Sequence, residues 1–199
     1  MRKIAIFASG TGSNAINLTQ TAQELGQVEV CCLIVDKASS PLPTYFSNHF
    51  PQVPVYLITP NPALKGEERR SHHEALILEK LRSHQVDWIF LAGYLRLIGQ
   101  LLLNNFPGKI VNIHPSLLPA YPGLGGFERT YADKATGGVT IHLVDQGLDT
   151  GPIILQRSIA RRDCDSLEDF ISRGKEAERE LYPQVLRMLN NSEKLLHGE

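Results

Sequence analysis

An amide and an imidazole stand two residues apart at the end of a short apolar run. Ile110-Val111 leads into Asn112 and His114, and Pro115 follows at once. The β-branched residues predict a buried strand, and the proline ends it because proline cannot donate to a ladder and favours an extended residue before it. Alternate residues of an extended chain point to the same side, so Asn112 and His114 face one small volume.

A carboxylate stands in a second polar cluster further along the chain. The stretch from Val144 to Pro152 carries Asp149 among turn-forming residues. An acid, an imidazole and an amide at strand ends are the groups needed to stabilise an oxyanion and to move protons. The structural alternative is a buried histidine bonded only to backbone, which is common. We take Asn112, His114 and Asp149 as the candidate catalytic residues.

The elements that position these residues alternate between strand and helix. Apolar runs predict strands at 4–8, 27–35, 53–58, 88–92, 109–114, 138–144 and 153–159, and helical spacing predicts helices at 15–25, 44–50, 66–84, 100–105 and 167–181. This alternation is typical of an α/β fold, a doubly wound, mostly parallel β-sheet flanked by helices. Pro54 favours an outer position for its strand, and Pro183 predicts a kink or restart of the last helix.

Composition limits the class of protein. The 199 residues predict one domain over 1–199, and 42% apolar with 21% charged residues is ordinary for a globular chain. A net charge of −1 gives no global basic field, so no nucleic-acid partner is expected. No apolar run is long enough to span a bilayer, and the first is too short for a signal peptide, so we expect a cytoplasmic protein with no membrane partner. The three cysteines have no zinc or disulfide spacing, and no metal is expected.

A glycine loop, Ser9-Gly-Thr-Gly-Ser-Asn14, follows the first predicted strand. A strand, a glycine loop and a helix start present bare N–H groups and the positive helix end to an anion. The loop is not a Walker sequence, and Ala15 stands where the full dinucleotide pattern has glycine. The pattern therefore indicates a phosphate site without naming the phosphate; the alternative is a tight turn with Asn14 as helix N-cap.

Three spaced motifs resemble those of the folate-dependent formyltransferases. They are Asn112 to Leu124, Thr140 to Val144 and Leu148 to Gln156, within a similarity that runs from Ile4 to about Pro183. Within this family the chain is most similar to the enzymes of purine biosynthesis. The resemblance implies a Rossmann-like fold and transfer of a formyl group from 10-formyltetrahydrofolate, as co-substrate, to the amine of glycinamide ribonucleotide.

The resemblance also assigns binding residues. It gives the phosphate and ribose of the substrate to Gly12, Ser13, Asn14, Arg69, Lys175 and Glu178, and the folate to Leu95, Arg96, Ile98, Val144, Asp145, Gln146, Gly147 and Leu148. The structural alternatives are a solvated helix face for Arg69, a salt bridge for Arg96 and a surface ion pair between Lys175 and Glu178. We expect a buried supporting role for His142. The partners implied are small molecules, with the chain a monomer or a homodimer.

The chain departs from the family pattern near the candidate catalytic strand. Phe127 stands where the family usually has a histidine, the interval from there to His142 is one residue shorter, and Val139 occupies a position expected to be polar. The acceptor amine therefore stays open. The alternatives are a formyltransferase acting on another amine, a formyltetrahydrofolate hydrolase, and a non-catalytic folate- or phosphate-binding module.

Overall fold

The computed structural model describes residues 1–162 and 164–189, which divide into two compact units. The first spans Met1–Ile110 and the second starts at Val111. The single domain expected over 1–199 stays a prediction.

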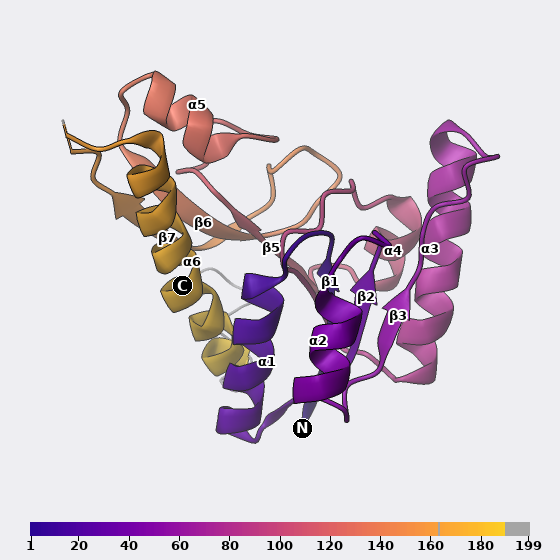
Figure 1. The fold of residues 1–199 in the computed structure, drawn as a ribbon. Helices are drawn as coiled ribbons and strands as arrows, with labels where there is room; N and C mark the ends of the chain where they lie inside the picture. The colour runs from indigo at the N-terminus through magenta and orange to yellow at the C-terminus, as the bar shows by residue number, and fades with distance from the viewer. Residues whose placement is uncertain (163, 190–199) are drawn as a thin grey trace. The chain divides into compact units, whose positions relative to one another are not determined.

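The first unit alternates parallel strands with helices (Figure 1). Its elements are β1 (Arg2–Ala8), α1 (Ser13–Leu25), β2 (Val28–Val35), α2 (Leu42–His49), β3 (Val55–Leu57), α3 (Gly66–Ser83), β4 (Trp88–Leu91) and α4 (Gln100–Asn105). β1 pairs in parallel with both β2 and β4, and β2 pairs in parallel with β3. Residues Ile4 to Ala8 of β1 are fully buried, which explains why the run is apolar without alternation.

The second unit contains β5 from Val111 onwards (Ile110–His114), α5 (Gly126–Ala132), β6 (Gly137–Leu143), β7 (Ile153–Ile159) and α6 (Leu167–Leu189). β5 pairs antiparallel with β6, and β6 with β7. Helix α6 packs on β6, β7 and α5. At the start of the unit, the Tyr182 hydroxyl of α6 donates a hydrogen bond to the Val111 carbonyl of β5 (3.2 Å).

The predicted α/β class is confirmed. In the first unit the strands lie in the order β3-β2-β1-β4, with β3, the strand preceded by Pro54, at an edge, and in the second unit they lie in the order β5-β6-β7. A β-strand can hold proline at an edge because no ladder hydrogen bond is lost there.

Two predictions about helices are wrong. Helix α5 stands where the sequence predicts no helix, and α6 continues past its predicted end at Leu181, through Pro183, to Leu189. The last turns of α6 bury Val185, Leu186 and Leu189. This apolar face supports the helix beyond the proline, because burial outweighs one missing backbone hydrogen bond.

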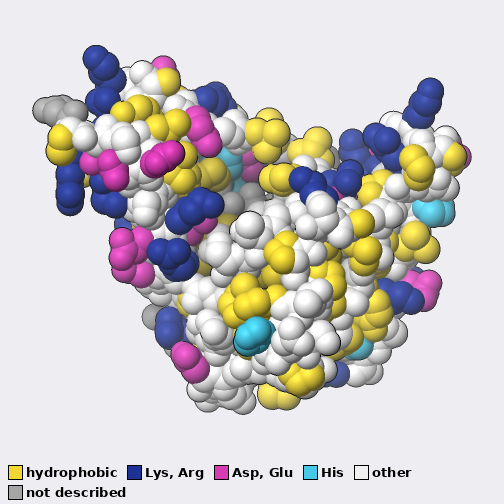
Figure 2. All heavy atoms as spheres, viewed as in Figure 1, with side chains coloured by type: hydrophobic (Ala, Val, Ile, Leu, Met, Phe, Trp, Pro, Cys, Tyr) yellow, Lys and Arg dark blue, Asp and Glu magenta, His cyan; other side chains and the backbone are white. Residues whose placement is uncertain are grey.

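Among residues 1–162 and 164–189, no helix combines the length and the apolar character needed to cross a bilayer. Acidic and basic side chains are mixed over the face drawn in Figure 2, as expected for a net charge of −1.

Candidate active site

The carboxyl-terminal half of β5 carries the predicted amide and imidazole. His114 is buried and Asn112 is half-buried, and in the antiparallel register Asn112 pairs with His142 of β6. His114 pairs with Thr140, whose hydroxyl donates to the Ser116 carbonyl (2.7 Å) and accepts from the Leu118 N–H (3.0 Å). Pairing with β6 thus fixes the position of β5 and of the loop that follows it.

Asp149 reaches this strand from the loop after β6. Its Oδ2 lies 3.3 Å from His114 Nδ1 and its Oδ1 lies 3.5 Å from His142 Nε2. The Gly123 N–H donates to Oδ2 (2.8 Å). The Asp149 backbone is left-handed, with φ of 54°, a conformation that non-glycine residues seldom adopt outside functional or tightly constrained positions. The predicted juxtaposition of Asp149 and His114 is therefore present.

The hydrogen bonds of His114 define its tautomer. Nε2 lies 2.9 Å from the Tyr121 carbonyl oxygen, and a carbonyl only accepts, so Nε2 carries the proton. In the neutral ring Nδ1 then presents its lone pair to the Asp149 carboxylate. Burial lowers the pKa of His114, against the opposing effects of the bond to Tyr121 and the charge of Asp149. The pair is ready to take up a proton between Nδ1 and Oδ2.

His142 belongs to the site although it is absent from the predicted catalytic set. Its side chain is almost fully buried; Nδ1 donates to the Leu143 carbonyl (2.8 Å), which leaves Nε2 to accept from the Asn112 amide nitrogen (3.1 Å). His142 therefore orients the Asn112 carboxamide. This agrees with the buried supporting role expected for His142, and its contact with Asn112 comes from the antiparallel pairing of β5 with β6, which sets the two residues opposite each other.

The carboxyl of Asp149 is a stable anion at neutral pH. The neighbouring His142 imidazole lowers its pKa to about 2, with help from the Gly123 N–H and from His114, while burial works in the opposite direction. The charge of Asp149 opposes the lowering of the His114 pKa by burial. The arrangement can hold an amide donor in place and store a proton.

The glycine loop of the first unit leads into α1. Gly12 is the N-cap residue with φ of 76°, and a Cβ built there would lie 2.3 Å from Leu42 Cδ2, so the position requires glycine. The helix begins at Ser13, so Asn14 lies within its first turn and the alternative of Asn14 as N-cap is wrong. Ser13 is exposed and Asn14 is buried. The first-turn N–H groups of α1 have no acceptor within the helix and suit an anion.

Sequence comparison identifies the family. The family model described as formyl transferase matches residues 2–186. A phosphoribosylglycinamide formyltransferase of Bacillus subtilis (strain 168) is 41% identical over 192 residues, which is 95% of each chain. The chain belongs to the formyl transferase family.

Two further relatives agree with this assignment. A formyl transferase of Haemophilus influenzae, named phosphoribosylglycinamide formyltransferase, is 34% identical over 94% of this chain and 86% of its own. The crystal structure of phosphoribosylglycinamide formyltransferase from Bacillus halodurans has a TM-score of 0.87 and 40% identity over 98% of this chain and all of that one. The family expected from the sequence motifs is confirmed.

The predicted folate residues of this formyl transferase occupy one segment in each unit. In the first unit Leu95 is exposed and Ile98 half-buried, and Arg96 forms an ion pair with buried Asp36. This ion pair is the alternative foreseen for Arg96, and it leaves part of the guanidinium exposed. The folate-binding role of these residues stays a prediction.

The second segment, residues 144–148, follows β6 and is mostly exposed. It carries the remaining predicted folate residues, Val144, Asp145, Gln146, Gly147 and Leu148. The Asp145 Oδ1 accepts from the Gly147 N–H (3.0 Å) and from the Thr150 hydroxyl (2.8 Å). These bonds fix the turn that delivers Asp149 to the imidazoles.

The remaining predicted substrate contacts lie on helices. Arg69 is exposed in the first turn of α3, Lys175 is exposed on α6, and Glu178 is half-buried on α6. The substrate-binding role of these three residues stays a prediction.

Phe127 belongs to the packing beneath α6. It is 5% exposed, meets Phe170 edge to face at 6.3 Å between ring centroids, and lies against Gly174. A Cβ at Gly174 would approach within 2.3 Å of the Phe127 ring. Phe127 therefore makes an apolar contact at the position where the resemblance led us to expect a histidine.

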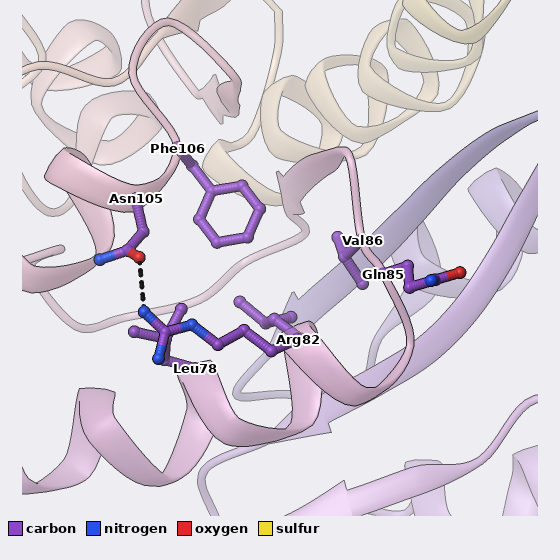
Figure 3. Close-up of a pocket in the computed structure, with 7 residues that line it drawn as sticks. Leu78, Arg82, Gln85, Val86, Asn105 and Phe106 are labelled. Carbon is purple, nitrogen blue, oxygen red and sulfur yellow. Dashed lines mark hydrogen bonds between the residues drawn. The ribbon is translucent and has the colours of Figure 1, made fainter.

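A cavity of about 310 Å³ lies in the first unit, at the ends of α3 and α4 (Figure 3). The Arg82 guanidinium donates to Asn105 Oδ1 at its rim (3.0 Å), and Leu78, Leu81 and Phe106 supply apolar walls. None of the predicted site residues lines it, and its lining has no acid or histidine to move a proton. We do not assign the reaction to it.

The part of the chain that the structure describes contains no group of three or more His, Cys, Asp or Glu side chains arranged to hold a metal ion.

Proposed function

We propose that this chain is a phosphoribosylglycinamide formyltransferase. It transfers a formyl group from 10-formyltetrahydrofolate to the amine of glycinamide ribonucleotide in de novo purine biosynthesis. The observation that carries the proposal is the contact of Asp149 with His114, 3.3 Å, beside Asn112 at the end of β5. Its 41% identical relative bears the same name.

Asn112 stabilises the charge that develops on the formyl oxygen. One amide hydrogen of Asn112 is donated to His142, so the carboxamide has a fixed orientation and keeps a second hydrogen for the substrate. A donor held in place before the reaction stabilises a developing oxyanion without reorganisation.

His114 and Asp149 handle the proton that the attacking amine loses. The neutral imidazole offers Nδ1 and the carboxylate offers Oδ2, two acceptors 3.3 Å apart, so a proton taken up there is shared by the pair. The resulting imidazolium adds a positive charge next to the developing oxyanion, and its proton then passes to the folate nitrogen, which leaves as its bond to the formyl carbon breaks. The Nε2 hydrogen of His114 can be donated to the formyl oxygen only after its hydrogen bond to the Tyr121 carbonyl breaks.

The substrate phosphate is assigned to Gly12, Ser13 and Asn14, and Arg69, Lys175 and Glu178 are assigned as further contacts to the phosphate and ribose of the substrate. The left-handed Gly12 and the helix start at Ser13 support the phosphate assignment, because they present N–H groups without a side chain in the way.

The folate is assigned to the segments 95–98 and 144–148. Leu95 in the first unit and Leu148 in the second each have an exposed apolar side chain of the kind that suits the flat ring of a folate. 10-Formyltetrahydrofolate supplies the one-carbon group when bound. We propose no metal and no nucleic-acid or membrane partner for this reaction. We expect a monomer or a homodimer in the cytoplasm.

Two assays on the purified chain test the proposal. The first measures formyl transfer from 10-formyltetrahydrofolate to glycinamide ribonucleotide, and the second measures release of formate without the amine. We expect transfer with little formate release. Formate release that does not depend on the amine would identify a hydrolase, and folate binding with neither activity would identify a binding module.

A further inference from the structure

Three buried polar side chains of the first unit converge on one exposed segment, Gly93–Gly99. At its start the Ser9 N–H donates to the Gly93 carbonyl (3.2 Å) and the Ser9 hydroxyl accepts from the Leu95 N–H (2.9 Å). At its end the Glu74 carboxylate accepts from the Gly99 N–H (2.5 Å). Backbone hydrogen bonds therefore hold both ends of the segment.

The middle of the segment is held through its own side chain, Arg96, and not through its backbone. Asp36, at the end of β2, accepts from Arg96 Nε through Oδ2. The Asp36 side chain is 1% exposed and that of Arg96 is 38% exposed. In the described part of the chain, the other carboxylate oxygen, Oδ1, has no hydrogen-bond partner.

An ion pair of this kind is a poor source of stability. Taking a carboxylate out of water is costly, and an oxygen left without a donor adds to the cost. A well-packed apolar pair would serve a purely structural purpose at least as well. The pair therefore points to a need for a particular orientation of Arg96.

The side chains of the segment alternate between inside and outside. Tyr94 is buried and packs edge to face on Phe7 with ring centroids 5.3 Å apart, while Leu95 and Leu97 are 57% and 60% exposed. Arg96, between the two leucines, is the residue that Asp36 holds. Fixing Arg96 consequently fixes the direction in which the two leucines face outward.

We propose that Asp36 is a positioning residue for the reduced-folate co-substrate. Through Arg96 it sets the shape of the segment 94–98 before the folate arrives, so that the exposed leucines and the guanidinium need no ordering on binding. This inference rests on the proposed function and deepens it, since it identifies a buried residue outside the predicted contacts. Preorganisation of this kind lowers the cost of binding more than it changes the chemical step.

The test compares Asp36→Asn with the unaltered chain. Asparagine keeps the size of the side chain and removes its charge. We expect the KM for 10-formyltetrahydrofolate to rise roughly 10-fold or more, as for loss of a charge-assisted hydrogen bond. The KM for glycinamide ribonucleotide and kcat should change by less than about 3-fold, since the groups at the reacting carbon are untouched. Calorimetric binding of tetrahydrofolate, which cannot react, should weaken by the same factor as the folate KM rises.

Glu79→Gln is the matched control. Glu79 pairs with Lys80 on the exposed face of α3, also in the first unit, and its side chain is 66% exposed. This variant removes a carboxylate charge from the same unit and should leave both KM values unchanged. In a double-mutant cycle, adding Asp36→Asn to Arg96→Gln should weaken folate binding no further than Arg96→Gln alone, because the two residues act through one contact.

Unchanged tetrahydrofolate affinity in Asp36→Asn would overturn the inference and leave the proposed function standing. Equal changes in the two KM values with a lowered melting temperature would also overturn it, since they indicate a structural role. If the single variant does not fold, the double variant with Arg96→Gln, which removes both charges of the pair, should show the same folate-specific rise in KM. Failure of the unaltered chain to bind tetrahydrofolate would overturn both proposals.

Discussion

Two carboxylates, Asp149 half-buried in the second unit and Glu74 buried in the first, have opposite surroundings. Asp149 faces the imidazoles of His114 and His142, and its own pKa is held at about 2. Glu74 accepts from the N–H groups of Gly99 and Leu102, which do not titrate, and burial raises its pKa. A carboxylate beside partners that change charge is equipped for a reaction, and one beside fixed dipoles is equipped to hold a loop.

The largest effect should come from removing the groups nearest the reacting carbon. His114→Ala and Asn112→Ala should each lower kcat roughly 100- to 1,000-fold, about 3 to 4 kcal/mol of transition-state stabilisation, with KM values changed only a few-fold. Steady-state kinetics with both substrates measures this. Near-normal turnover in both variants would remove the distinction drawn between the two carboxylates.

Asp149→Asn should lower kcat to a comparable extent, because the imidazole loses the anion that stabilises its protonated form. The negative charge of Asp149 raises the pKa of His114 against the effect of burial, so the variant should show a still lower pKa for that imidazole. A titration of the ring by NMR measures it. An unchanged His114 titration would mean that the two groups are not coupled.

Acid stability should separate the carboxylates further. The pKa of Asp149 is lowered from 3.8 to about 2, so its stabilising effect is present above pH 3.8 and is lost as the pH falls through about 2. The unaltered chain should exceed Asp149→Asn in free energy of unfolding by about 2 kcal/mol near neutral pH. Urea unfolding at several pH values should show this difference shrinking between pH 4 and 2. A difference independent of pH would argue for a purely steric effect.

The smallest effect is expected at Glu74. Glu74→Ala removes the acceptor for two N–H groups at the start of α4 and should lower the free energy of unfolding by about 1 kcal/mol, as for loss of a helix N-cap. Turnover at saturating substrate should stay within about 3-fold, since the residue holds a loop and moves no proton. Glu79→Ala on the same helix is the control for stability. A loss of kcat as large as that of His114→Ala would place Glu74 in the chemistry.

The sequence was sufficient for most of the fold, because the strands are continuous apolar runs and the helices between them have clear spacing. Asn112, His114 and Asp149 could also be proposed from the sequence, since Asn112 and His114 lie at the end of an apolar strand, Asp149 follows another, and the motif spacing links them. His142 required the antiparallel register of β5 and β6, which no local pattern contains. Asp36 required a contact with Arg96, 60 positions away in the chain, and such pairs follow from tertiary structure alone.

The two wrong helix predictions have the same origin. Helix α5 is short and begins at Gly126, directly after Gly125, and two adjacent glycines predict a loop. The helix nevertheless buries Phe127 against α6. The last turns of α6 continue beyond Pro183 because their apolar face is buried within the second unit. In both, tertiary packing overrides local propensity.

The contact of Phe127 with Gly174 makes these two positions mutually dependent over evolutionary time. A β-carbon at 174 has no space while an aromatic ring occupies 127, and a smaller group at 127 would leave an unfilled volume next to a glycine. Relatives that carry histidine at the first position should therefore show a different residue, or a shifted helix, at the second. Substitutions tolerated singly in those relatives should fail in this chain unless both positions change together.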